Sequence, residues 1–253
     1  MLNAARHPPS RAFTLIELLV CIVIVATLIG LIIPALARVR VRARVVQATT
    51  VTAGCNYALA QYAVDHRDSH LYFQSPMEPW RDVELDGVPR PRLAYFIAGL
   101  EGWVNFLPKD YLAADPRTFD ADGPAAMAAR NATHGLPADF IWSRFRLTQT
   151  VFASREFWRT PVTGQAPEGY CKGTLSADIS NPSAKGMVAD VGLLRAPAHG
   201  QDPLVPVSFA DGSATVFTYE QWASLPSADA PWGYGLHFEG IFATPDGLSG
   251  KDR

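Results

Sequence analysis

The chain lacks the short motifs on which enzyme predictions usually rest. It has no Gly-x-Ser-x-Gly elbow, no Walker loop, no His-Glu-x-x-His run and no paired cysteines. Three cysteines in 253 residues are too few for the disulfide framework of a small secreted scaffold. Isolated Ser, His and Asp residues occur in any chain of this length and define no site. We therefore expect no enzymatic activity.

Charge is absent from one long run near the N-terminus, from Leu18 to Ala37. Residues 13–37 are enough to cross a bilayer as a helix at about 1.5 Å per residue. A secretory signal would have a shorter apolar core and a cleavage site after it, so we expect a retained membrane helix. Pro34 has no backbone N–H, which predicts a kink near it.

Glu17 is the residue of this segment whose burial costs free energy. A carboxylate at mid-bilayer costs about 2.5 to 3.5 kcal/mol on insertion scales, and less near an end of the span. A positive charge that meets Glu17 after assembly would offset that cost. We therefore predict a functional role for this side chain.

The run Phe13-Thr14-Leu15-Ile16-Glu17, followed by an apolar helix, resembles the processing signal of type IV pilins and type II secretion pseudopilins. The resemblance implies that a prepilin peptidase cuts between Ala12 and Phe13 and methylates the new amine of Phe13. It also implies that Glu17 pairs with the N-terminal amine of a neighbouring subunit and that Pro34 belongs to the family pattern. The family usually has Gly where this chain has Ala12.

The resemblance also implies a domain order. Residues 1–12 are the leader, 13–37 the transmembrane and filament-core helix, 38–70 its amphipathic extension, and 71–253 an extracytoplasmic head. Charge alone favours the reverse orientation, because four arginines follow the apolar run and only two precede it. We follow the resemblance.

Helical periodicity continues beyond the apolar run and predicts one helix from about residue 14 to about 66. Steps of four and three residues build a seam on one helix face. We expect this face to pack on the protein's own head, with a coiled-coil dimer as the alternative. The seam consists of Val41, Val45, Ala48, Thr52, Cys55, Leu59 and Tyr62.

The fold class predicted for the whole chain is α+β, a long helix packed under a head with a small antiparallel sheet. Met187–Leu194 is apolar and β-branched enough for a strand. Val205–Ala210 and Ser213–Tyr219 flank Asp211-Gly212, a strong hairpin signal. Pro206 would place the first of these at a sheet edge or delay its start.

A second resemblance covers the C-terminal part. Met187–Asp190, His199 and Val207–Ala214 resemble a pilin-like family named for a His, nine variable residues and Asp-Gly. Eleven residues separate His199 from Asp211 here. The helix from Cys55 to His66 resembles the same family.

Metal candidates in the head are few, and otherwise we expect no cofactor. Asp190, Asp202 and Asp211 are calcium candidates if they converge near one end of the sheet, because carboxylate oxygens suit that ion. His66 and His70 stand four residues apart, but zinc needs three or four converging ligands, so a polar helix end is the favoured interpretation.

Two further predictions concern the interior of the head. Cys55 and Cys171 could form a disulfide in an extracytoplasmic head, but two buried free thiols are the interpretation we favour. Aromatic residues crowd the range from Phe140 to Trp158, which predicts a core rather than a ligand cage.

The resemblance implies a structural subunit of a type II secretion pseudopilus or a type IV pilus-like filament. Its partners would be prepilin peptidase, the inner membrane, and other pilin or pseudopilin subunits in a homo- or hetero-oligomeric filament. The head would lie in the periplasm or on an extracellular filament. After Val45 there are 16 basic and 23 acidic residues, which gives no support for nucleic-acid binding.

Two alternatives stay open. One is an uncleaved single-pass envelope protein whose head binds a partner or ligand. The other is a membrane-tethered enzyme, which needs a cleft with converging titratable groups.

We predict that the mature chain begins at methylated Phe13. Mass spectrometry of the protein purified from cells with an active prepilin peptidase would detect this N-terminus. An intact Met1 in such cells would contradict the prediction and favour the uncleaved anchor.

Overall fold

The computed structural model describes residues 14–71, 83–85, 88–90, 100–112, 119, 123–134, 140–159, 173–192, 203–226, 240–242 and 244–252. The chain divides into two compact units, Met1–Arg44 and Val45–Arg253. Predictions about five residues lie outside the described ranges and stay predictions. These residues are Ala12, Phe13, Cys171, His199 and Asp202.

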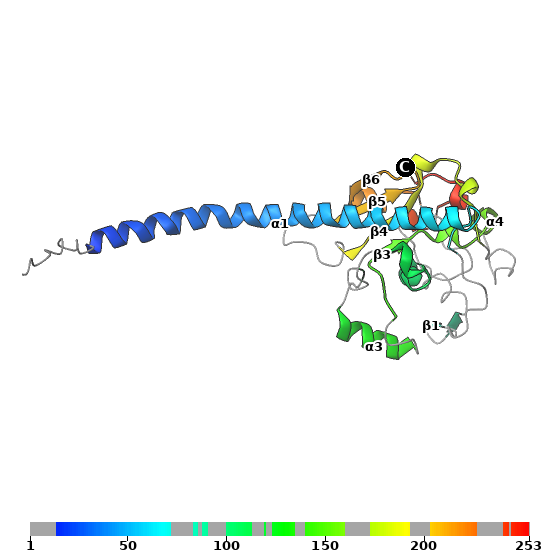
Figure 1. Cartoon of the computed structure of the whole chain (residues 1–253), viewed down its shortest axis with the longest axis horizontal. Coiled ribbons are helices and arrows are strands. Elements are labelled where there is room, and N and C mark those ends of the chain that lie inside the picture. The colour runs from blue at the N-terminus through cyan, green and yellow to red at the C-terminus, as the bar shows by residue number, and fades with distance from the viewer. Residues whose placement is uncertain are drawn as a thin grey trace, which may run out of the picture. The chain divides into compact units, whose positions relative to one another are not determined.

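Helix α1 runs without interruption from Leu15 to Asp65, a length of 51 residues (Figure 1). This confirms the single long helix expected from the periodicity. The helix continues through Pro34, although that residue cannot donate a backbone hydrogen bond. The predicted kink there stays a prediction.

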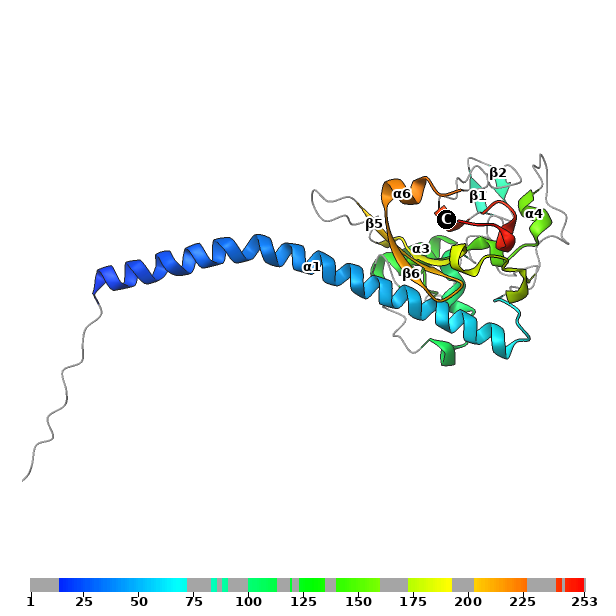
Figure 2. The same cartoon turned by 90° about the horizontal axis from the view of Figure 1, so that it is seen from above.

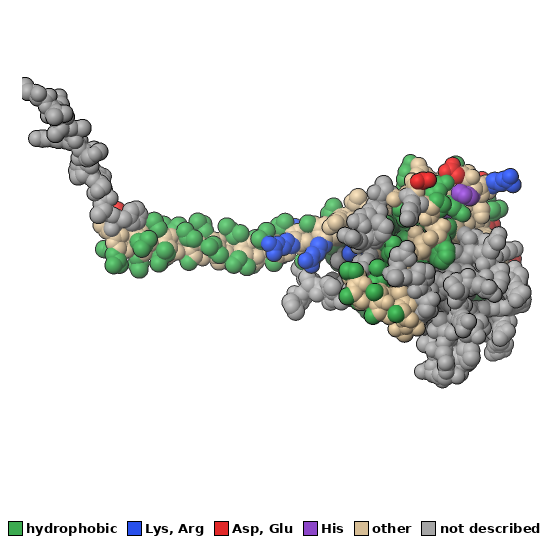
Figure 3. All heavy atoms as spheres, turned by 60° about the horizontal axis from the view of Figure 1, so that its bottom comes forward, with side chains coloured by type: hydrophobic (Ala, Val, Ile, Leu, Met, Phe, Trp, Pro, Cys, Tyr) green, Lys and Arg blue, Asp and Glu red, His purple; other side chains and the backbone are tan. Residues whose placement is uncertain are grey.

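In the first unit, the side chains of α1 are almost all exposed. Every residue from Leu15 to Arg40 is exposed, and none of the most apolar window, with a mean hydropathy of 3.0, is buried. Figure 3 shows apolar side chains along this part of the helix, with basic side chains towards its end. By length and composition, α1 is able to cross a membrane as a single helix.

In the second unit, the remainder of α1 supplies one wall of the head's core. Ala48, Thr52, Cys55 and Leu59 are buried, which confirms that the predicted seam faces the head. The side-chain amide of Asn56 donates to the carbonyl of Phe209 at 2.6 Å, so α1 is also hydrogen-bonded to the sheet. Figures 1 and 2 show this part of α1 beside strands β4 to β6.

The sheet of the head is four-stranded and antiparallel, in the order β3-β4-β5-β6. Its strands are β3 (Phe145–Leu147), β4 (Gly186–Asp190), β5 (Leu204–Phe209) and β6 (Ala214–Thr218). β5 and β6 flank the Asp211-Gly212 turn, where Gly212 takes a φ of 84°. The predicted hairpin and the α+β class are thereby confirmed. A separate antiparallel pair joins β1 (Val83–Leu85) to β2 (Val88–Arg90).

The prediction that Pro206 places its strand at a sheet edge or delays the start of that strand is wrong, because β5 begins at Leu204. Its strand, β5, is an inner strand with β4 on one side and β6 on the other. The pairing of β4 with β5 extends only to Ala189 opposite Val207, one residue short of Pro206. Because the ladder to β4 ends before Pro206, its missing N–H removes no hydrogen bond from that side.

Helices and aromatic side chains fill the rest of the second unit. The described α-helices of this unit include α3 (Pro124–His134), α4 (Arg155–Arg159) and α6 (Tyr219–Ala223), with short 3-10 turns such as η8 (Gly240–Phe242) and η9 (Gly247–Ser249) between strands and helices. The predicted aromatic core is confirmed, since all six aromatic residues named for it are buried. They are Phe140, Trp142, Phe145, Phe152, Phe157 and Trp158.

Replacing glycine with alanine should lower the free energy of unfolding at one position of the second unit and raise it at another. A Cβ on Gly186 would lie 2.3 Å from Cγ2 of Ile241, which is itself fully buried. A Cβ on Gly54, an exposed residue of α1, meets nothing within 4 Å. Gly186→Ala should therefore lower the free energy of unfolding by about 1–3 kcal/mol.

Gly54→Ala is the matched control and should raise the same free energy by about 0.5–1 kcal/mol, because Ala costs less backbone entropy in a helix. Thermal unfolding of the full chain in detergent measures both. Equal effects of the two substitutions would contradict the packing described around Gly186.

Candidate functional site

The first turn of α1 holds the carboxylate singled out by the sequence. Oε2 of Glu17 accepts hydrogen bonds from the backbone N–H of Thr14 at 2.9 Å and from its hydroxyl at 2.8 Å. In return, the N–H of Glu17 donates to the Thr14 hydroxyl at 3.2 Å. This reciprocal pattern is a capping box, which satisfies backbone donors that the start of a helix leaves open.

Thr14 is the helix cap that positions Glu17, and the sequence contains a signal for it. Thr14-Leu15-Ile16-Glu17 matches the pattern Ser or Thr, two residues, then Glu that precedes an apolar helix. The cap matters more next to lipid than in water, because lipid offers no hydrogen-bond partner to an open backbone N–H. Glu17 therefore has a local structural role in addition to any role in assembly.

The capping box leaves part of the carboxylate available. Thr14 donates both of its hydrogen bonds to Oε2 of Glu17, and no group among the described residues donates a hydrogen bond to Oε1. The first basic residue of the described helix is Arg38, 21 positions further on, which is about 30 Å along the axis at about 1.5 Å per residue. Within its own described helix, Glu17 thus has no counter-charge.

In the head, Asp190 is held by an ion pair rather than left open for a metal. Its carboxylate is fully buried and meets the guanidinium of Arg144 at 2.6 Å. The N–H of Gly192 donates to the same carboxylate at 2.8 Å. Burial raises the pKa of Asp190, and Arg144 acts in the opposite direction.

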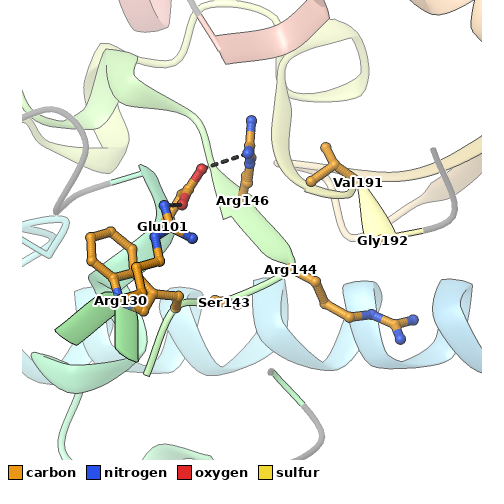
Figure 4. Close-up of a pocket in the computed structure, with 8 residues that line it drawn as sticks. Glu101, Arg130, Ser143, Arg144, Arg146, Val191 and Gly192 are labelled. Carbon is orange, nitrogen blue, oxygen red and sulfur yellow. Dashed lines mark hydrogen bonds and ion pairs between the residues drawn. The ribbon is translucent and has the colours of Figure 1, made fainter. Parts of the chain in front are cut away.

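Arg144 belongs to a group of charged side chains around a small pocket (Figure 4). Glu101 accepts from Arg130 at 2.7 Å and from Arg146 at 2.5 Å. The Arg130 guanidinium also lies 3.8 Å from the ring centre of Trp142. Arg130 and Arg146 therefore share Glu101, whereas Arg144 pairs with Asp190. Both sets of ion pairs connect β3 or the residue before it to other parts of the head.

The structure does not bring the described calcium candidates together. Asp190 ends β4, whereas Asp211 stands in the β5–β6 turn. It follows Phe209 by two residues, and Phe209 pairs with Gly186 at the start of β4. The two carboxylates therefore lie at opposite ends of the sheet. Asp211 accepts from the N–H and hydroxyl of Ser213 at 2.9 and 2.6 Å, as a turn residue does. Calcium binding by the head stays a prediction without support from this pair.

The two histidines also separate. His66 is exposed and stacks on the Tyr62 ring, with ring centres 3.9 Å apart. His70 is buried beyond the end of α1, and burial lowers its pKa to about 4. Within the described ranges, its Nε2 has no hydrogen-bond partner.

Cys55 is buried and has no disulfide partner among the described residues, and burial raises the pKa of its thiol. Such a group is a packed apolar side chain rather than a reactive one. Its pairing with Cys171 stays a prediction because Cys171 is outside the described ranges.

Comparison with known families gives one match. Residues 8–33 match the model of the prokaryotic N-terminal methylation motif. No curated protein and no solved structure matches the chain. With the long apolar helix that contains most of it, the motif fits a type IV pilin-like protein, and it implies processing by a prepilin peptidase and assembly with pilin subunits in general.

Buried His70 predicts a loss of stability in mild acid. Its folded pKa of about 4 lies below the ordinary value of 6.5, so the unfolded chain takes up the proton first. The free energy of unfolding is therefore highest above pH 6.5 and decreases by about 3 kcal/mol as the pH falls to 4. Denaturant unfolding of the full chain between pH 4 and 7 measures it.

The control is His70→Gln, which removes the titrating group and keeps a polar side chain. The variant should lose less stability than the natural chain over this pH range. Identical pH profiles would contradict the burial of a neutral His70.

Proposed function

We propose that this chain is a structural subunit of a type II secretion pseudopilus or a type IV pilus-like filament. It is stored in the inner membrane through residues 13–37, with the head on the periplasmic side. A prepilin peptidase removes residues 1–12 and methylates the amine of Phe13. The subunit then joins a filament of like or related subunits, where the head coats an interior made of α1 helices and performs no catalysis.

The observation that carries this proposal is the state of Glu17. The residue lies within a methylation motif, at the first turn of an apolar helix. One of its oxygens is used for capping, and the other has no partner in the described part of the chain. The amine of a neighbouring Phe13, which exists only after cleavage, would supply the missing positive charge. A charged pair away from water is strong only when both partners are present.

The second half of α1 gives independent support for contacts between helices. From Val45 to Val64, twenty residues in succession carry no charge. Val46, Tyr57 and Val64 are large apolar residues on this stretch and are between 65% and 72% exposed. A helix that faced only water would be expected to carry charges there. We infer that neighbouring subunits cover this face in the filament.

The main alternative is an uncleaved single-pass protein whose head binds a partner or ligand. In that protein, Glu17 would serve as a helix cap alone, and its charge would be dispensable. The two proposals therefore differ in whether the charge of Glu17 is needed in addition to its capping oxygen. Single substitutions can remove the charge and the cap one at a time.

Glu17→Gln keeps a side-chain oxygen for the Thr14 box and removes the charge. We expect the variant to reach the membrane normally and to fall more than about a hundredfold in filament incorporation, since loss of one partner from a buried ion pair costs about 3–5 kcal/mol. Glu17→Ala should have the same outcome. Immunoblots of membrane and sheared-filament fractions provide the measurement.

Thr14→Ala is the matched control, because it removes the cap and keeps the charge. It costs about 0.5–2 kcal/mol of local helix stability and should reduce incorporation by far less. Normal incorporation of Glu17→Gln, or equal losses in Glu17→Gln and Thr14→Ala, would refute the role of the charge in assembly.

A further inference from the structure

Three polar side chains of the head form a closed chain of hydrogen bonds in its interior. Lys185, Thr244 and Asp252 are all completely buried. The amine of Lys185 lies 3.2 Å from Oδ2 of Asp252 and donates to the hydroxyl of Thr244. That hydroxyl in turn donates to Oδ1 of Asp252. A continuous path of hydrogen bonds thus connects the amine with the farther oxygen of the carboxyl group.

The backbone on both sides of Lys185 fixes the position of Asp252. The N–H of Gly186 donates to Oδ2 of Asp252 at 2.8 Å. The N–H of Asp252 donates to the carbonyl of Ala184 at 2.9 Å. The carboxyl carbon is therefore held against the lysine amine by contacts that do not involve the amine itself.

Burial also favours the reactive protonation state of the pair. It lowers the pKa of Lys185 and raises the pKa of Asp252, and each partner's charge acts against these shifts. Both directions favour a neutral amine beside a neutral carboxylic acid. A neutral amine is a nucleophile, and a neutral acid is a better electrophile than a carboxylate.

We propose that Lys185 and Asp252 condense within the folded head to form an amide cross-link between the two side chains. This inference does not depend on the proposed filament function, because it rests on the interior of the second unit alone. The cross-link would join the start of β4 to the segment after η9.

The step balances without an oxidant or a further reactant. The lone pair of Lys185 Nζ attacks Cγ of Asp252, and the carbonyl electron pair moves to Oδ2, which the Gly186 N–H stabilises as an oxyanion hole does. One proton passes from Nζ through the Thr244 hydroxyl to Oδ1. The C–Oδ1 bond then breaks, Oδ2 becomes the amide oxygen again, and Oδ1 leaves as water with the acid's own proton.

Peptide mapping of the full-length protein tests the cross-link directly. Trypsin normally cuts after Lys172, Lys185, Arg195 and Lys251. In the cross-linked protein, residue 185 is no longer cut, so a branched peptide results. It consists of residues 173–195 joined to Asp252-Arg253, and it is lighter than its two parts by one water molecule. Tandem mass spectrometry should locate the branch at Lys185.

Intact mass alone does not decide the question. The four Asp-Gly pairs of the chain can also lose water by forming cyclic imides, whereas only the branched peptide reports the amide. Recovery of the linear peptides 173–185 and 252–253 in full yield from the folded, purified protein would overturn the proposal.

Two variants test the chemistry. Lys185→Arg replaces the amine with a guanidinium that stays protonated and is no nucleophile, so it should give no branched peptide. Thr244→Val keeps the shape of the side chain and removes the proton path, so it should yield the branched peptide at least about tenfold more slowly. An unchanged rate in Thr244→Val would overturn the proton path. Should either variant fail to fold, the map of the natural chain still decides whether the cross-link exists.

Discussion

The structure depends on one constraint, namely that a carboxylate at the start of an apolar helix must be satisfied by protein. Neither lipid nor a core of packed helices offers it water. Thr14 meets half of the requirement, because its N–H and hydroxyl both donate to Oε2 of Glu17. The other half is a positive charge, and the described helix offers none within reach. In the filament that we propose, the amine of a neighbouring subunit would supply this charge.

The need to cover exposed groups also explains why the two parts of α1 have different surfaces. In the first unit, apolar side chains are exposed on all sides, so the helix needs lipid or other helices around it. In the second unit, one face is buried by the sheet and the aromatic core. The opposite face stays uncharged for twenty residues. One continuous helix thus provides both an exposed apolar segment, long enough to cross a membrane, and a wall of the head's core.

The sequence allowed prediction of the features that arise from local patterns. The long helix, its buried seam, the hairpin at Asp211-Gly212 and the aromatic core all follow from periodicity, turn chemistry and hydrophobic burial. Pro206 could not be placed correctly, because the length of the β4 ladder depends on tertiary register. The placement of Asp190 and Asp211 at opposite ends of the sheet also depends on register, so the sequence could not predict it. The Thr14 cap is a local feature too, since the pattern Thr-x-x-Glu before an apolar helix predicts it. The cluster of Lys185, Thr244 and Asp252 joins residues up to 67 positions apart, which no local pattern reveals.

The most direct test of the account is whether Glu17 touches the N-terminal amine of the next subunit. A zero-length carbodiimide reagent joins a carboxylate only to an amine in direct contact with it. Filaments assembled from a mixture of isotopically light and heavy subunits would show whether a cross-link is formed between chains. We predict a Glu17–Phe13 cross-linked peptide pair with mixed isotope labels. Filaments that contain this chain, react with the reagent elsewhere and yield no such pair would contradict the account.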